Sequence, residues 1–504
     1  MKQPNYLKNL DSLIAAIIGF IAIHIYTKYS GVGISPDSIM YASTAKSICT
    51  HGTLITFNGT PLVFFPVFYP FFLSVILFIS RVDTIAAAPV INGLLFAGVI
   101  FTSGVIISKF KSYSPIYKWL VLIGIILSPG LLEIYTYLWS ETLFILEIML
   151  FVLAYHNYMQ KHTMASLILV SVLIAISCIT RYAGVTLIGA GGLMLLLDNQ
   201  LVIRRKIAHV LIFGFISISL LVCNLILNRL STGLSTGTRE PAITPLSKNL
   251  YYSGNVMCDW MGLPHSAYSY SILIVCFLLL FLVAIIVWRA FTGKINSIEN
   301  IVIMFAAFYG IFIPALASVS RFETLNSRLL SPMFVCLLIG LTCWVPDLLK
   351  GLKLRKQITF AIPFVALMLF SEYSIAMTDY QRYDDENDYG VPGYSDDDWN
   401  KSQFVPFLKS HKSIYKAGVP IYTDADEAVY FFTGATSKLL PHRYFKSTVE
   451  QFFGVKHYYL IWFNNLNNPE LIGLQDIVKK EKLQLLYQFP EGAVYEYKET
   501  SSIK

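Results

Sequence analysis

The chain has 504 residues, of which 55% are hydrophobic and only 14% are charged, with a formal net charge of +7. Soluble domains carry roughly a quarter charged residues, so this composition excludes an ordinary soluble enzyme and favours a polytopic membrane protein. Because 18 of the 31 acidic residues lie at or beyond Asp379, the basic excess belongs to the first three quarters of the chain. The positive-inside bias of membrane proteins accounts for that excess, so it does not indicate nucleic-acid binding.

The first apolar run, 12–27, follows Lys2 and Lys8 and is not followed by a small-residue cleavage site, which predicts an uncleaved first span. Later windows carry few or no charges, and most reach the ~17–25 residues that cross about 30 Å of hydrocarbon as a helix. These windows are 84–108, 119–137, 142–160, 163–180, 182–197, 207–228, 266–288, 300–320, 329–346 and 357–377. We therefore predict an all-α transmembrane domain over residues 1–378 with about eleven transmembrane helices.

Lysine and arginine clusters between these windows predict the orientation of the spans. If every cluster is cytoplasmic, strict alternation holds from residue 84 onward and places the C-terminal region outside the cytoplasm. The clusters are Lys109, Lys111 and Lys118; Lys161; Arg204, Arg205 and Lys206; Arg289 and Lys294; and Lys350, Lys353, Arg355 and Lys356. The short window 66–80 contains two prolines. Counted as a full span, it would move every one of these clusters to the opposite side of the membrane. We interpret it as an interfacial or membrane-dipping helix after a first outer loop, 29–65.

Residues 379–504 have the pattern of a small extramembrane α/β domain that follows an acidic linker, 383–399. Strands are predicted at 420–423 and 457–463, helices at 426–432 and 471–482, and a strand pair over 485–497. All seven cysteines precede residue 344, so no disulfide framework is implied for this domain.

The first outer loop contains an acidic candidate, Asp37, in the sequence Ser35-Pro36-Asp37. A helix that opens near Asp37 would bring Tyr41, four residues later, to the same face. An ionised carboxylate there suits proton abstraction from an acceptor hydroxyl or coordination of a hard cation. The alternative is that Asp37 only caps the helix.

Three further charged groups lie at span ends on the same predicted face. Glu141 begins the span 142–160, where dipole compensation is the alternative to a functional role. Arg181 separates two apolar windows and could hold a phosphate or reach the lipid headgroups. Arg321 and Arg328 flank a tight turn, in which an internal pair with Glu323 is the alternative to phosphate binding. Carboxylates for a hydroxyl and arginines for a lipid phosphodiester together fit sugar transfer.

Five motifs follow one another in order along the chain: Ser35-Pro36-Asp37-Ser38 with Tyr41 and Ala45, Phe64-Phe65-Pro66-Val67-Phe68-Tyr69-Pro70, Ser140-Glu141-Thr142-Leu143-Phe144, Thr180-Arg181-Tyr182-Ala183-Gly184 and Ser327-Arg328-Leu329-Leu330-Ser331-Pro332. This ordered set resembles the GT-C glycosyltransferases, in particular bacterial relatives of protein O-mannosyltransferases and aminoarabinose transferases. The resemblance covers about residues 12–335.

The resemblance implies an inverting enzyme that uses a polyprenyl-phosphate sugar, with Asp37 as general base. The family often has a second acid directly after that base; here Ser38 stands there, which leaves Glu141 as the second catalytic acid. The substrate-binding candidates are Tyr41, Lys46, Tyr69, Arg181, Tyr182, Arg321 and Arg328. A metal site is not identified, and a divalent cation is the one cofactor left open.

The predicted function is transfer of a sugar from a polyprenyl-phosphate carrier to a lipid, glycan or protein acceptor, without nucleic acid as a partner. The predicted location is the bacterial inner (plasma) membrane, with a cytoplasmic N-terminus and an extracytoplasmic C-terminal domain. A lipid-linked sugar flippase or transporter, a glycan polymerase or ligase, and a non-catalytic sensor are the alternatives.

Overall fold

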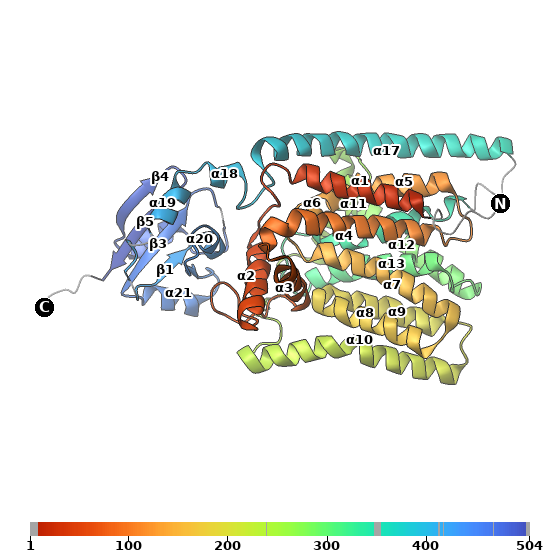
Figure 1. The fold of residues 1–504 in the computed structure, drawn as a ribbon, viewed down its shortest axis with the longest axis horizontal. Helices are drawn as coiled ribbons and strands as arrows, with labels where there is room; N and C mark the ends of the chain where they lie inside the picture. The colour runs from red at the N-terminus through yellow and green to blue at the C-terminus, as the bar shows by residue number, and fades with distance from the viewer. Residues whose placement is uncertain are drawn as a thin grey trace.

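The computed structural model describes residues 9–237, 239–346, 354–411, 414–416, 418–466 and 468–499. Lys2 and Lys8, which entered the prediction of the first span, lie outside these residues, as do Lys350 and Lys353, which entered the prediction of orientation. Figure 1 shows a bundle of long helices with a small sheet-containing domain beyond one end, which we call the domain-facing end.

Every predicted span window coincides with helix. The bundle contains α1 (Leu10–Tyr26), α4 (Thr84–Ile107), α5 (Pro115–Ile126), α6 (Pro129–Tyr135), α7 (Glu141–Lys161), α8 (Met164–Thr180), α9 (Val185–Leu197), α10 (Ile203–Thr232), α12 (Ser271–Phe291), α13 (Ile298–Ala317), α14 (Ser327–Leu330), α15 (Phe334–Thr342) and α17 (Leu354–Tyr389). Among the described residues, five helices are long and apolar enough to cross a membrane, or six if α5 and α6, bent by 53°, form one span. The protein is an integral membrane protein, and the count of about eleven spans stays a prediction.

Two helices after α1 cross the domain-facing end of the bundle instead of running along it (Figure 1). They are α2 (Pro36–His51) and α3 (Phe68–Ser80). The 13 residues of α3 span about 20 Å at 1.5 Å per residue, less than the hydrocarbon thickness. The length of α3 therefore agrees with the expected short helix at 66–80.

The loops at the other end of the bundle contact one another. His162 Nε2 lies 2.8 Å from Asp198 Oδ2, and Asn296 donates to Asp198 Oδ1 at 2.7 Å. Lys118 Nζ pairs with Asp11 Oδ1 at 2.7 Å. These loops carry or adjoin the basic clusters at 109–118, 161, 204–206 and 289–294. These four clusters therefore share one end of the bundle, which is the arrangement that strict alternation predicts for them.

The long polar loop 229–265 contains a helix that the sequence did not predict, α11 (Leu246–Trp260). One side of α11, which includes Ser253 and Met257, is buried against α12 and α13. The mixed polar and apolar composition of this segment concealed the helix, because its apolar side is completed only by tertiary packing.

The C-terminal domain is a five-stranded mixed sheet in the order β2-β1-β3-β5-β4. The strands β1 and β3 are parallel, and β5 pairs antiparallel with β3 and β4. The central strand β3 is almost entirely buried, which explains its continuous apolar sequence. The elements are α18 (Asp397–Asn400), α19 (Phe404–Ser410), β1 (Ile421–Thr423), α20 (Asp426–Thr433), β2 (Lys438–Leu439), α21 (Lys446–Phe453), β3 (His457–Phe463), α22 (Leu474–Lys480), β4 (Gln484–Phe489) and β5 (Gly492–Lys498).

The linker differs from its expectation, because residues 383–389 continue α17 as helix. After α17 ends, the chain runs along the first outer loop: Tyr394 donates its N–H to Ile34 O, and Ser395 Oγ donates to Val32 O, both at 2.9 Å. On the other side of this loop, Gly33 N–H donates to Thr136 O at 2.8 Å. The segment before α2 is thus held between the linker and the segment that leads into α7.

Candidate active site

Asp37 lies in the first turn of α2, and Ser35 caps that helix. Ser35 Oγ accepts the Ser38 N–H and Ser38 Oγ accepts the Ser35 N–H, which forms a capping box. Trp139 Nε1 also donates to Ser35 Oγ at 2.8 Å. Because Ser35 satisfies the helix terminus, the Asp37 carboxylate is free for another partner, and the capping alternative for Asp37 is removed.

Glu141 is the first residue of α7, and its side chain is completely buried. The preceding segment is held by tertiary contacts: Asn92 Nδ2 donates to both Tyr135 O and Tyr137 O, and the Tyr137 and Trp139 rings stack with their centroids 4.2 Å apart. Several contacts around the α6–α7 connection therefore fix the position of Glu141 at the start of α7.

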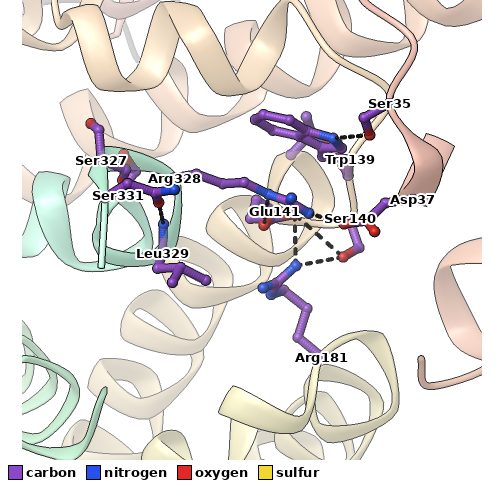
Figure 2. Close-up of polar contacts among 12 residues, drawn as sticks. Ser35, Asp37, Trp139, Ser140, Glu141, Arg181, Ser327, Arg328, Leu329 and Ser331 are labelled. Atoms are coloured by element: carbon purple, nitrogen blue, oxygen red, sulfur yellow. Dashed lines mark hydrogen bonds and ion pairs between the residues drawn. The ribbon is translucent and has the colours of Figure 1, made fainter. Parts of the chain in front are cut away.

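The two predicted phosphate-binding arginines enter from two other elements. Arg181 follows the last turn of α8, and its guanidinium turns into the protein toward Ser140 and Glu141, so it does not reach toward headgroups (Figure 2). Arg328 lies in the first turn of α14, where Asn326 caps the helix by accepting the Leu329 N–H. Its guanidinium lies over the Trp139 ring, 4.0 Å from the centroid.

Figure 2 shows these four side chains converging at one place, and we call them the charged quartet: Asp37, Glu141, Arg181 and Arg328. Glu141 uses both oxygens, Oε1 to Arg328 Nε at 2.8 Å and Oε2 to Arg181 Nη1 at 2.6 Å. Arg328 also pairs with Asp37 through Nη2. The quartet is formally neutral, and each guanidinium has a carboxylate partner.

The two acids of the quartet have different surroundings. The Asp37 side chain is 25% exposed, whereas that of Glu141 is 0% exposed and is engaged on both oxygens. Asp37 can therefore meet a hydroxyl from the cavity. The geometry of Glu141 favours positioning of the two guanidiniums over direct participation as a second acid.

The quartet opens into a cavity of about 660 Å³ at the domain-facing end. Asp37, Arg181 and Arg328 line it, while its apolar walls come from α10, α13 and the first outer loop. Such a cavity has room for a polar headgroup beside an apolar chain. Further lining residues are Tyr41, Phe64, Phe65, Tyr182, Leu221, Leu225, Arg239, Tyr309, Phe312, Ile313, Leu316, Phe322 and Glu323.

The remaining predicted residues divide into two sets. Tyr41 reaches the quartet, since its hydroxyl lies 3.1 Å from Ser140 Oγ; Tyr69 packs edge-on against Tyr41 at 4.9 Å; and Tyr182 lines the cavity. Lys46 is exposed nine residues along α2 from Asp37 and does not line the cavity. Arg321 lies outside the quartet.

Arg321 instead joins three parts of the protein. Its guanidinium pairs with Glu240 of the α10–α11 loop and with Glu470 of the C-terminal domain. The alternative considered for this turn, an internal pair with Glu323, is absent from the described residues, because Glu323 faces the cavity.

Four participants were not predicted as site residues: Trp139, Ser140, Glu323 and Arg239. Trp139 and Ser140 lie in the motif quoted around Glu141 or directly before it, but their roles depend on neighbours far away in sequence. The sequence alone could have pointed to Arg239. Strict alternation of the spans places the loop 229–265 outside the cytoplasm, where the positive-inside bias disfavours a basic residue. For Glu323, partial burial in the cavity wall raises the pKa of its carboxyl, although the Arg328 guanidinium opposes the shift.

The charged quartet does not fit a divalent cation. Among the described residues, no group of three His, Cys, Asp or Glu side chains could hold a metal ion. Glu141 directs both oxygens, and Asp37 one, at guanidiniums, which would repel a cation.

Comparison of the whole chain with solved structures identifies similar folds. ArnT from Cupriavidus metallidurans matches in its apo state (TM-score 0.56, 11% identity, 96% of both chains) and bound to undecaprenyl phosphate (0.57, 12%, 97% of both). The archaeal oligosaccharyltransferase AglB from Archaeoglobus fulgidus, in complex with an inhibitory peptide and a dolichol-phosphate, matches at TM-score 0.54 and 12% identity over 90% of this chain and 69% of that chain. No protein-family model and no curated protein matches in sequence. The shared property is the fold.

Proposed function

From the GT-C glycosyltransferase fold of this chain and the charged quartet at its cavity, we propose that the protein is an inverting glycosyltransferase. It moves a sugar from a polyprenyl-phosphate carrier to an acceptor hydroxyl. The observation that carries the proposal is the meeting of Asp37, Glu141, Arg181 and Arg328, from four separate elements, beside one amphipathic cavity. Carboxylate and guanidinium groups are the types needed for a hydroxyl acceptor and a phosphate leaving group.

A long isoprenoid chain fits the surroundings of the quartet. A second cavity, of about 770 Å³ and lined by apolar side chains, lies between α9, α12 and α13 and shares Phe312 with the first cavity. The two cavities therefore adjoin at Phe312, and both have apolar walls on α13. The lipid phosphates bound to ArnT and AglB support a polyprenyl-phosphate donor for this chain.

Asp37 begins the reaction in this proposal by accepting the proton of the acceptor hydroxyl. The ion pair with Arg328 weakens Asp37 as a base. A donor phosphate that binds Arg328 replaces Asp37 as its partner and releases the carboxylate. The hydroxyl oxygen then bonds to the anomeric carbon as the bond from that carbon to the phosphate oxygen breaks with inversion. The departing phosphate takes the electron pair.

The arginines act on the leaving group. The phosphate changes from a diester with one negative charge to a monoester with a second, and donors already in place stabilise that change. Glu141 holds Arg181 and Arg328 at fixed separation, so neither has to reorganise during transfer.

The gathering of the basic clusters at the opposite end favours an outward-facing site. With those clusters in the cytoplasm, the quartet and the C-terminal domain face the other side of the membrane. We propose the inner membrane of a bacterium as the location and an envelope lipid, glycan or protein as the acceptor.

The test is turnover of the purified full-length protein with polyprenyl-phosphate sugars, followed as released polyprenyl phosphate. Asp37→Asn should lower the rate by roughly 10²–10⁴-fold, with donor binding retained because the competing carboxylate is gone. The matched control is Asp83→Asn, since Asp83 is an exposed acid at the N-terminus of α4 and lies outside the cavity. A near-full rate in Asp37→Asn would disprove the assigned role, and movement of lipid without bond cleavage would indicate a transporter.

A further inference from the structure

The cavity has one cation whose charge is not offset by a paired acid. Arg181 and Arg328 belong to the neutral quartet. Arg239 also lines the cavity, and within the described part of the chain no carboxylate lies within ion-pair distance of its guanidinium. The other lining acid, Glu323, experiences chiefly the charges of the quartet. Arg239 therefore lies beside the quartet without an ion pair to either of its carboxylates.

The side chain of Arg239 is held only weakly. Its Nε donates to Thr236 Oγ1 at 3.3 Å, and its guanidinium lies 6.0 Å from the Tyr182 ring centroid, at the outer limit of a cation–π contact. The residue is exposed. An anion can therefore bind this guanidinium without breaking an existing ion pair.

The backbone that carries Arg239 is, in contrast, well anchored. Glu240 O accepts the Arg321 N–H at 2.9 Å, and the Glu240 carboxylate pairs with the Arg321 guanidinium. On the preceding side, Gly237 has φ of 69°, and a Cβ there would lie 2.7 Å from the Phe64 ring. Only glycine allows both this backbone conformation and this close approach. A weakly held guanidinium on a fixed backbone is suited to receive a ligand at a defined place.

We propose that Arg239 is the residue that first binds the phosphate of the lipid-linked donor. This inference rests on the proposed function and deepens it. A sugar phosphodiester carries one negative charge, which the neutral quartet does not offset, and one guanidinium with parallel N–H donors matches both the charge and the geometry. Arg239 docks the intact donor first. The phosphate then reaches Arg328, which releases Asp37 before transfer and stabilises the second negative charge during transfer.

The experiment measures binding of two lipids to the full-length protein in detergent: the methyl ester of undecaprenyl phosphate, a phosphodiester with one negative charge like the donor, and undecaprenol, which lacks the phosphate. Arg239→Gln should weaken binding of the phosphate lipid about 10-fold or more, as expected for loss of a charge-assisted hydrogen bond. Binding of the alcohol should not change. Arg239→Lys keeps the charge but not the paired donors. Its affinity for the phosphate lipid should lie between those of Arg239→Gln and the unmodified protein.

The matched control is Arg229→Gln, because Arg229 is an exposed arginine in the last turn of α10 and lies outside the cavity. This variant should bind both lipids normally. If the unmodified protein binds the phosphate lipid and Arg239→Gln binds it equally well, the inference about Arg239 is wrong while the proposed function stands. If the unmodified protein does not distinguish the phosphate lipid from the alcohol, both fail.

Discussion

Arg328 and Glu141 are separated by 187 positions in the chain, yet Arg328 Nε lies 2.8 Å from Glu141 Oε1. The contact joins the first turn of α14 to the first turn of α7. Because Glu141 also binds Arg181, one buried carboxylate sets the positions of both guanidiniums of the charged quartet. The geometry of the whole charged quartet therefore depends on Glu141.

Glu141→Gln should destabilise the protein and reduce turnover together. The substitution leaves two guanidiniums with a single carboxylate partner, and breaking a buried ion pair costs about 3–5 kcal/mol. Thermal unfolding in detergent and turnover measure the two effects. Glu299→Gln is the matched control, because Glu299 is also a first-turn glutamate, of α13, at the opposite end of the bundle. If both substitutions changed thermal stability and turnover equally, Glu141 would act only by compensating the dipole of its helix.

Gly393→Ala should alter the charged quartet indirectly, because Gly393 lies in the linker that packs against the segment before α2. Gly393 has φ of 126°, and a Cβ there would lie 2.5 Å from Ile34 O, a backbone atom that cannot move aside easily. We expect the linker to separate from residues 32–34, with a cost of about 1–3 kcal/mol for the strain and lower turnover. Hydrogen exchange of the amides at 33–38 should increase.

Gly454→Ala is the control for this substitution, since Gly454 has negative φ and its nearest neighbours would lie 3.5 Å from an added Cβ. Unchanged exchange at 33–38 in Gly393→Ala would show that the linker does not position α2.

Asp424→Asn should change how the stability of the C-terminal domain depends on pH. Burial raises the pKa of Asp424 to about 7, although its carboxylate accepts the Phe463 N–H at 3.1 Å. The folded domain therefore binds this proton more tightly than the unfolded chain does. The resulting stabilisation is fully present below pH about 4, the ordinary value for Asp, and is lost as the pH rises to about 7.

In the asparagine variant, the free energy of unfolding of the domain should change less with pH across that range. Near pH 8 the variant should be more stable than the unmodified protein, by an amount on the order of 2 kcal/mol. Protection of the β3 amides from hydrogen exchange, at several pH values, measures this difference. Burial and the neighbouring Glu427 carboxylate also raise the pKa of Asp426, to about 8, so part of the slope should remain. A constant difference between variant and unmodified protein from pH 4 to 8 would contradict the prediction.

Hydrophobic windows in the sequence were enough to locate the helices of the bundle, because crossing a membrane forces nearly uninterrupted apolar sequence. The alternating and continuous apolar patterns near 421–423 and 457–463 located β1 and β3 for a related reason, since these strands are buried in their own sheet. The candidates Asp37, Glu141, Arg181 and Arg328 were found because ionisable groups beside apolar spans are costly.

The partners of these groups were not readable in the sequence. Whether Arg321 or Arg328 belonged to the quartet depended on the α13–α14 turn, and the structure directs Arg321 instead to Glu240 and Glu470. Local patterns determined which ionisable residues stand at the ends of apolar segments, because the cost of burying charge acts on each segment separately. Which carboxylate meets which guanidinium was decided by tertiary packing, because such contacts join segments that lie far apart in the chain.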